Sequence, residues 1–228
     1  MTTPATTSGD FRKLLGLPER SIDRIEGEMD RKPHLPGDLR HERQTAKAET
    51  RDARQVKTAT EAMARIPGPG EAFHLAISGR FALWHFVEAA LSLAECKIDM
   101  LHIATLGFSK KNIEAMTQLV DRGDIQRVRL LCSHYFKNTS KPIYQHAVSA
   151  FEARPDRMEF LSIRTHAKIL LLAFEDGRRI TVESSANLRS CKNIEQVAII
   201  GDPGLHSFHR QWIDDLFGGP DHAAHPAA

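Results

Sequence analysis

The stretch Thr165–Gln196 reads THAKILLLAFEDGRRITVESSANLRSCKNIEQ, and it decides how the rest of the chain is interpreted. The apolar run after Lys168 predicts one strand, and Asp176-Gly177 predicts a hairpin turn before a second strand. Polar side chains of five chemical types lie at the ends of this hairpin and just beyond it: His166, Lys168, Ser184, Ser185, Asn187, Asn193 and Glu195. Reactions at phosphate use such a set, because they need a nucleophile or proton carrier, a positive charge, neutral donors and a carboxylate that orients the imidazole.

The composition indicates an ordinary globular protein. Of the 228 residues, 41% are hydrophobic and 26% are charged, which is enough to form one buried core. A formal net charge of +2 neither requires nor excludes a nucleic-acid partner. The three cysteines, Cys96, Cys132 and Cys191, lack the spacing of a disulfide framework or of a cysteine zinc site. We interpret Cys191, inside the polar loop, as a bystander thiol.

The N-terminal sequence MTTPATTSGD lacks the basic and apolar segments of a secretory signal. The longest apolar run, close to Ala167–Phe174, is too short to span a bilayer as a helix. We therefore expect no transmembrane segment and a cytoplasmic location.

Residues 1–66 predict a partly disordered helical arm. Residues 1–10 are small and polar, Ser21 is a suitable cap for a short helix over 21–31, and the stretch 39–66 is rich in good helix formers. Pro67-Gly68-Pro69-Gly70 ends that second helix. Such an arm packs on the main domain or on a second subunit, or its basic residues contact nucleic acid, although the interspersed acids favour the first interpretation.

From residue 67 to 218 strands and helices alternate, and 219–228 is expected to be a flexible tail. Besides the hairpin, strands are expected over 72–77, 98–106, 125–132, 158–163 and 196–200. Helices are expected over 81–94, 109–120, 141–154 and 203–217, the last with Leu205, Phe208, Trp212 and Leu216 facing inward. This order predicts an α/β sandwich with a mixed central sheet flanked by helices.

The hairpin and its surroundings resemble the phospholipase D superfamily, the HKD phosphodiesterases. His166-Ala167-Lys168 matches the first part of the family motif, Ser184-Ser185-Ala186-Asn187 the second, and Asn193-Ile194-Glu195 the third. Ala173 stands where the motif has Asp, and Ser184 stands where it has Gly. The span from Lys168 to Ser185 is longer than the motif, with the extra residues at the turn. The resemblance covers about residues 70–217 and implies a phospholipase D-like catalytic domain.

The resemblance implies a two-step displacement at a phosphodiester that needs no metal or other cofactor. His166 attacks phosphorus and forms a phosphohistidine, while a second histidine protonates the leaving oxygen. Lys168, Ser185 and Asn187 hold the phosphate oxygens, and Glu195 accepts from the other imidazole nitrogen. Ser184, Asn193 and Arg164 are the expected substrate-binding neighbours.

The motif occurs once, so the second histidine is expected from the partner subunit of a homodimer. Other histidines, His74, His102 and His146, fit better as strand or helix residues with local partners. His206 and His209 are spaced i, i+3 on the last predicted helix, but no third metal ligand is evident.

Three functions remain open from the sequence: a nuclease acting on DNA or RNA, a catalytically silent nucleic-acid-binding module, and a phospholipase. Small single-motif members of the family point to nucleic acid, and no interfacial amphipathic segment points to lipid. Basic residues near the strand ends either line a phosphate-binding groove or are ordinary solvated charges: Arg127, Arg129, Lys137, Lys141, Arg164, Arg178, Arg179, Arg189 and Lys192.

Overall fold

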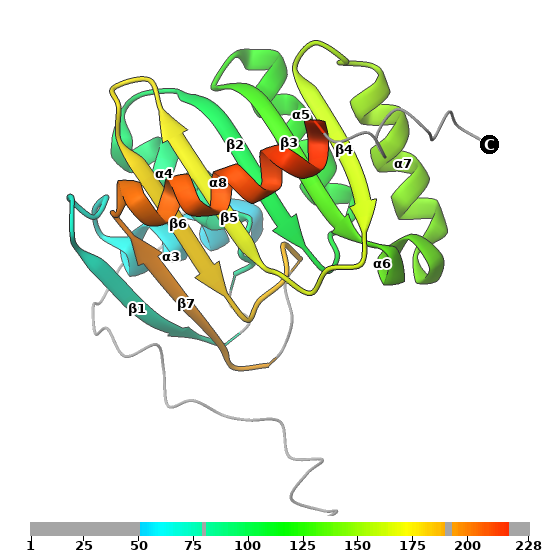
Figure 1. Ribbon diagram of the computed structural model, residues 1–228. Coiled ribbons are helices and arrows are strands. Elements are labelled where there is room, and N and C mark those ends of the chain that lie inside the picture. Colours follow the sequence, from blue (N-terminus) through cyan, green and yellow to red (C-terminus); the bar gives the residue numbers. More distant parts are fainter. Residues whose placement is uncertain (1–50, 79–80, 190–192, 219–228) are drawn as a thin grey trace, which may run out of the picture. The chain divides into compact units, whose positions relative to one another are not determined.

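The computed structural model describes residues 51–78, 81–189 and 193–218 (Figure 1). The first part of the expected arm, the expected helix over 21–31, Cys191, Lys192 and the tail after Gly218 lie outside the described residues.

A single mixed sheet organises the described part of the chain. Its strands are β1 (Ala72–Ile77), β2 (Ile98–Thr105), β3 (Ile125–Ser133), β4 (Met158–Ile163), β5 (Ile169–Phe174), β6 (Arg179–Ser184) and β7 (Glu195–Ile200). They are ordered β1-β7-β6-β5-β2-β3-β4, with β2, β3 and β4 parallel and every other neighbouring pair antiparallel. The predicted mixed sheet is confirmed, and the ends of the five strands predicted outside the hairpin agree within one residue.

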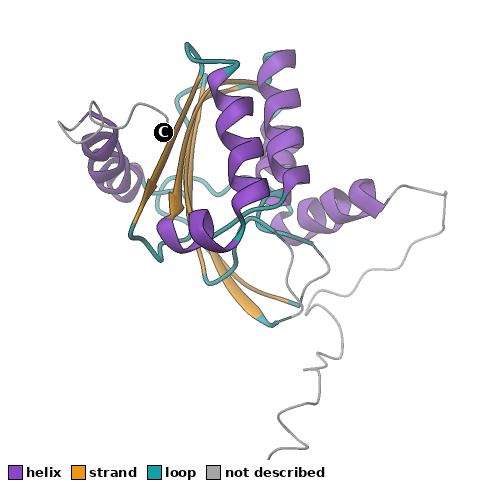
Figure 2. Cartoon of the chain, turned by 90° about the vertical axis from the view of Figure 1, so that its right-hand side faces the viewer, coloured by secondary structure: helices purple, strands orange, loops and turns teal. Residues whose placement is uncertain are grey.

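Helices cover both faces of this sheet, and the α/β class is confirmed (Figure 2). The helices are α3 (Arg51–Met63), α4 (His85–Ala94), α5 (Lys110–Arg122), α6 (His134–Thr139), α7 (Lys141–Glu152) and α8 (Pro203–Gly218). Ser109 begins α5 with a reciprocal capping box to Asn112. The six-residue α6 is absent from the sequence prediction, because so short a helix leaves no periodic pattern. No helix in the described ranges is both long and apolar enough to cross a membrane.

Two apolar cores fill the space between the layers. The larger core joins α4, α5 and α7 to one face of the sheet, and it also buries Ala59 and Met63 of α3. The smaller core lies under α8, where Ile213 and Phe217 contact Ala104, Leu131 and Leu171 of the strands. Because both faces of β5 are covered, all six of its residues are buried, which explains its continuous apolar sequence.

The buried face of α8 is displaced by one residue from the predicted one, so that prediction was wrong. The helix buries His206, His209, Ile213 and Phe217, whereas Phe208 is 65% exposed. The sheet surface beneath the first turns of α8 is polar, so two imidazoles, of which His209 forms a hydrogen bond to Glu183, replace the apolar side chains that a helical pattern favours.

Candidate functional site

One edge of the sheet collects the residues singled out from the sequence. The ends of β2, β3, β4 and β6 meet the starts of β5 and β7 there, at the lower edge in Figure 1. Antiparallel pairing aligns Ile169 with Glu183, and Ser184 N donates to Lys168 O at 3.1 Å. The start of β7 lies on the other side of β6, where Val197 pairs with Ser184.

The additional hairpin residues lie at the end of the hairpin far from this edge. The turn passes through Gly177 with φ of 92°, a conformation that favours glycine. The β5–β6 pairing is unbroken from Ile169–Glu183 to Ala173–Arg179. Ala173, at the Asp position of the motif, is buried on β5. The longer turn therefore leaves the two motif-bearing ends of the hairpin in register.

His166 and Lys168 form a close pair in the loop between β4 and β5. His166 is exposed, and Lys168 Nζ lies 3.2 Å from His166 Nδ1 and donates to the His166 carbonyl at 3.0 Å. An ammonium can only donate, so Nδ1 accepts and the neutral imidazole carries its proton on Nε2. Burial lowers the pKa of Lys168, and the Glu195 carboxylate partly opposes this shift.

Two serines fix the loop after β6 to the start of β7. Ser185 Oγ donates to the Glu195 carboxylate and accepts from Gln196 N at 3.1 Å. Ser184 Oγ donates to Gln196 O at 2.8 Å and accepts from Ala186 N at 2.9 Å. The Ser184 hydroxyl proton is thus used by the backbone, while Ser185 connects the loop to a carboxylate.

Glu195 and His166, which were expected to contact each other, have other neighbours in this structure. Glu195 accepts from Ser185, and His166 Nδ1 faces Lys168. The strand order explains this arrangement, because β6 lies between β5, which follows His166, and β7, which begins at Glu195.

Asn187 has a buried amide oxygen with no hydrogen-bond partner among the described residues. The backbone of the next residue, Leu188, forms two hydrogen bonds. Leu188 N donates to Thr105 Oγ1 at 3.5 Å, and Trp84 N donates to Leu188 O at 3.4 Å. A buried polar atom without a partner costs about 1–3 kcal/mol, so a ligand group that donates a hydrogen bond to this oxygen would recover free energy. Arg164 and Asn193 are exposed at the same edge.

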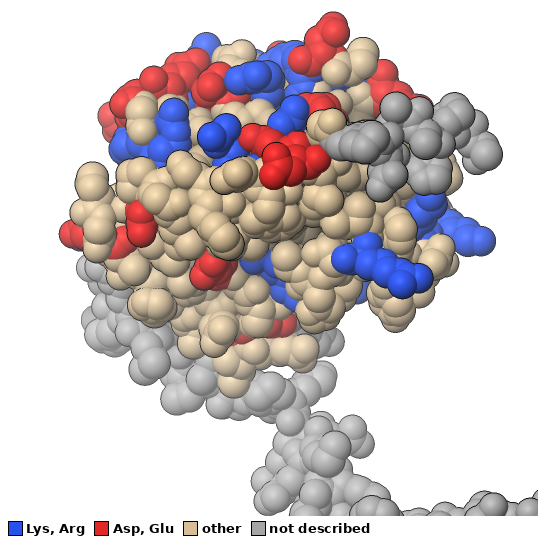
Figure 3. All heavy atoms as spheres, in the orientation of Figure 1, with Lys and Arg blue, Asp and Glu red and all other residues tan. Residues whose placement is uncertain are grey.

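An exposed aromatic residue that the sequence analysis missed lies at the same edge of the sheet. Tyr135 on α6 is 66% exposed, directly after the end of β3. His134 Nε2 donates to Ser162 O at 2.8 Å and thereby fixes α6 against the end of β4. Exposed Lys137 and Arg164 lie on the same side, and Figure 3 shows blue side chains over this corner without red ones beside them. The signal was an aromatic pair, Tyr135-Phe136, directly after a strand.

The basic residues expected to line one groove are divided between the two ends of the strands. Lys137, Lys141, Arg164 and Arg189 follow the strand ends near His166. Arg127 lies near the start of β3 and Arg129 at its middle, where it pairs with Asp214 of α8, and Arg178 and Arg179 lie at the hairpin turn. A strand of six residues spans about 20 Å, so the second group belongs to a different surface.

His102 and His209 each lie within hydrogen-bond distance of a carboxylate. His102 Nε2 lies 2.8 Å from Asp214 Oδ1. Trp212 Nε1 donates to His209 Nδ1 at 3.1 Å, so His209 Nε2 carries the proton that it donates to Glu183 at 2.8 Å. His74 is exposed on β1. Within the described ranges, no three His, Cys, Asp or Glu side chains are arranged to hold a metal ion.

No family model and no curated protein match this sequence. Among solved structures, polyphosphate kinase from Porphyromonas gingivalis matches with a TM-score of 0.48 and 13% identity, over 69% of this chain and 27% of that one. A mutant of yeast tyrosyl-DNA phosphodiesterase matches with a TM-score of 0.33 and 9% identity, over 57% of this chain and 31% of that one. The aligned part is thus less than a third of either solved structure.

Proposed function

We propose that this chain is a metal-independent phosphodiesterase of the phospholipase D type that hydrolyses DNA or RNA. The observation that carries the proposal is the convergence at one sheet edge of the His166–Lys168 pair, the Ser185–Glu195 pair and the Asn187 side chain. Imidazole, ammonium, hydroxyl, amide and carboxylate are the groups that a displacement at phosphorus requires.

The reaction begins with the imidazole of His166. Its Nε2 lone pair attacks phosphorus, the bond to the leaving oxygen breaks, and a second histidine donates a proton to that oxygen. Water, deprotonated by the second histidine, then attacks phosphorus and breaks the P–N bond, which regenerates His166. In the structure Lys168 faces Nδ1, and the proton is therefore on Nε2. A substrate phosphate that draws the ammonium away allows the proton to move to Nδ1 and frees Nε2 for attack.

Three neighbouring groups stabilise the phosphate in this proposal. Lys168 is half-buried, and its charge acts more strongly on a phosphate oxygen there than in open water. The Asn187 amide carries Nδ2–H donors for a second oxygen, and Ser185 offers its hydroxyl when the proton turns from the Glu195 carboxylate to the phosphate. Ser184, Asn193 and Arg164 complete the proposed substrate-contacting set at the rim.

A homodimer supplies the second histidine in this proposal. His166 is exposed at the sheet edge, where the same residue of a two-fold related copy can approach it. Ile194, next to Glu195, is apolar and 45% exposed, so it offers a side chain that such a dimer contact would bury. Residues 67–218 form the catalytic domain and 1–66 the arm, in a protein that we place in the cytoplasm.

Tyr135 favours a nucleic-acid substrate over a lipid, because an exposed ring beside basic side chains suits base stacking. We expect Tyr135→Ala to raise the KM for a single-stranded oligonucleotide by about 5- to 100-fold, since stacking contributes about 1–3 kcal/mol per base. Phe208→Ala on α8 is the matched control, with a ring that is 65% exposed away from this edge. Equal KM values for the two variants would contradict the stacking role.

The function is tested by incubating the full chain with DNA, RNA and phosphatidylcholine vesicles in excess EDTA. We expect cleavage of nucleic acid and an acid-labile phosphoryl group on His166 in quenched reactions. Faster cleavage of the vesicles would instead favour a phospholipase. Salt-sensitive binding of nucleic acid without turnover would favour the catalytically silent module.

A further inference from the structure

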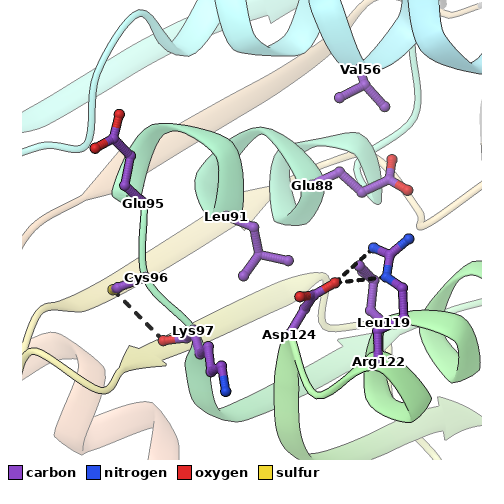
Figure 4. Close-up of a pocket in the computed structure, with 9 residues that line it drawn as sticks. All are labelled: Val56, Glu88, Leu91, Glu95, Cys96, Lys97, Leu119, Arg122 and Asp124. Atoms are coloured by element: carbon purple, nitrogen blue, oxygen red, sulfur yellow. Dashed lines mark hydrogen bonds and ion pairs between the residues drawn. The ribbon is translucent and has the colours of Figure 1, made fainter.

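Two of the cavities that lie away from the proposed catalytic edge differ in chemistry. The larger, about 490 Å³, lies between α3, α4 and α5 (Figure 4). Its Arg122 and Asp124 side chains pair with each other at 2.7 Å, and no unpartnered buried polar atom of the described residues lines it. The second, about 400 Å³, lies under the first turns of α8 on the opposite face of the sheet. Four arginines, three carboxylates and two histidines line this α8 cavity.

The α8 cavity is at the opposite end of the strands from His166. Ala173 and Arg179 border it at the far ends of β5 and β6, whereas Lys168 and Ser184 lie at the near ends. Figure 3 shows blue and red side chains gathered in the upper part of the molecule, away from the lower edge. A ligand in this cavity would therefore be distinct from a substrate at His166.

Two buried imidazoles that line this cavity have ring nitrogens without partners. His102 is 1% exposed and His206 is 2% exposed. His102 Nδ1 and His206 Nε2 have no hydrogen-bond partner among the described residues. Each such atom costs about 1–3 kcal/mol, which a ligand that reached it from this cavity would recover.

The arginines around this cavity are unequally neutralised. Three are paired, at 3.6 Å for Arg127–Asp99, 2.6 Å for Arg129–Asp214 and 3.3 Å for Arg210–Asp214. Arg179 instead donates to the carbonyl oxygens of Phe174 and Arg178, and it has no carboxylate partner in the described ranges. Its backbone contacts hold the guanidinium in place and leave its charge available to an anion.

The surroundings of both imidazoles disfavour their protonation. Burial lowers the pKa of His206 to about 4, and the charge of Arg179 is the next cause. Burial also lowers the pKa of His102 against the opposing effect of its hydrogen bond to Asp214, and Arg129 and Arg210 lower it further. With both rings neutral, four guanidinium groups face three carboxylates across this cavity.

We propose that the α8 cavity binds a small phosphorylated molecule that also carries a hydroxyl group, such as a sugar phosphate. The phosphate lies between Arg179 and Arg210, and neutral His206 donates its Nε2 proton to a phosphate oxygen. His102 donates through Nε2 to Asp214, so its Nδ1 accepts from the ligand hydroxyl. A volume of about 400 Å³ holds more than a bare phosphate and is within the range of small-ligand sites.

Calorimetric titration of the full chain with ribose 5-phosphate tests this site. We expect saturable binding that Arg179→Gln weakens by about 10- to 100-fold, the effect of losing one charged hydrogen-bonding group. Ser207→Glu is a second variant, because Ser207 lines this cavity from the exposed side of α8 and the added charge repels the phosphate without changing the hairpin turn. Arg54→Gln, an exposed arginine on α3, is the control and should bind like the wild type.

Lys168→Met separates this site from the proposed catalytic one and should leave the affinity for ribose 5-phosphate unchanged. Retained affinity in Arg179→Gln and Ser207→Glu together with a loss in Lys168→Met would overturn the assignment, because the ligand would then occupy the His166 edge. The absence of saturable binding to the wild type would overturn it as well and would leave water as the occupant. Ribose alone is expected to bind far more weakly, since it lacks the group that Arg179 holds.

Discussion

His166→Asn is expected to lower the rate of phosphodiester hydrolysis in excess EDTA by about 10⁴-fold or more. The amide of Asn keeps a side chain of comparable polarity but has neither the nucleophilic lone pair nor the proton-carrying ring of histidine. In a two-fold symmetric site this single substitution removes the nucleophile and the leaving-group acid together. The measurement is the initial rate on a fluorescent oligonucleotide with purified full-length protein.

His74→Asn is the matched control, because His74 is exposed on β1 outside the proposed site. It should retain the wild-type rate. If the two variants kept equal activity, His166 would not be the nucleophile.

Mixed dimers give a second measure of the shared site. When wild-type and His166→Asn chains are refolded together in equal amounts, only dimers with two wild-type subunits are expected to be active, so activity falls to about a quarter. Independent sites in each chain would retain about half of the activity. A protein that sediments as a monomer at assay concentration would exclude the shared site.

The elements predicted from the sequence were those with strong local signals. The continuous apolar run of β5, the Asp176-Gly177 turn and the Ser109 cap each depend on a few neighbouring residues, and each lies where it was expected. The buried face of α8 depends instead on the surface beneath it. His206 and His209 face a polar part of the sheet, and no pattern within the helix contains that information.

The candidate site likewise has a part that local sequence predicts and a part that depends on the strand order. His166 and Lys168 are two residues apart, and the antiparallel hairpin places Ser184 beside Lys168, so a local pattern was sufficient. The partner of Glu195 depended on the strand order, which places β7 next to β6 and away from β5. The separation of Arg127 and Arg179 from the proposed catalytic edge likewise required knowing at which strand end each residue lies.

The free energy of unfolding is expected to fall as the pH is lowered from about 6.5 to about 4. His206 is buried and its folded-state pKa is about 4, against an ordinary value of 6.5. Within this window the unfolded chain binds a proton at His206 and the folded chain does not, so acid favours the unfolded state. The contribution of His206 is on the order of 3 kcal/mol, fully present above pH 6.5 and lost by pH 4. His102, whose pKa is also lowered, acts in the same direction.

Urea unfolding of the wild type and His206→Leu at several pH values measures this contribution. The variant should show a shallower loss of stability over the same window, because it has no imidazole to protonate at residue 206. Glu71 and Asp176, with pKa values of about 2, lose the stabilisation from Arg65 and Arg178 as the pH falls through their ordinary pKa values toward 2, and they do so equally in both proteins. Parallel slopes for the two proteins would show that His206 is already protonated in the folded state. The wild type should also lose less stability on acidification in ribose 5-phosphate, because a bound phosphate beside His206 favours the protonated ring and raises its pKa.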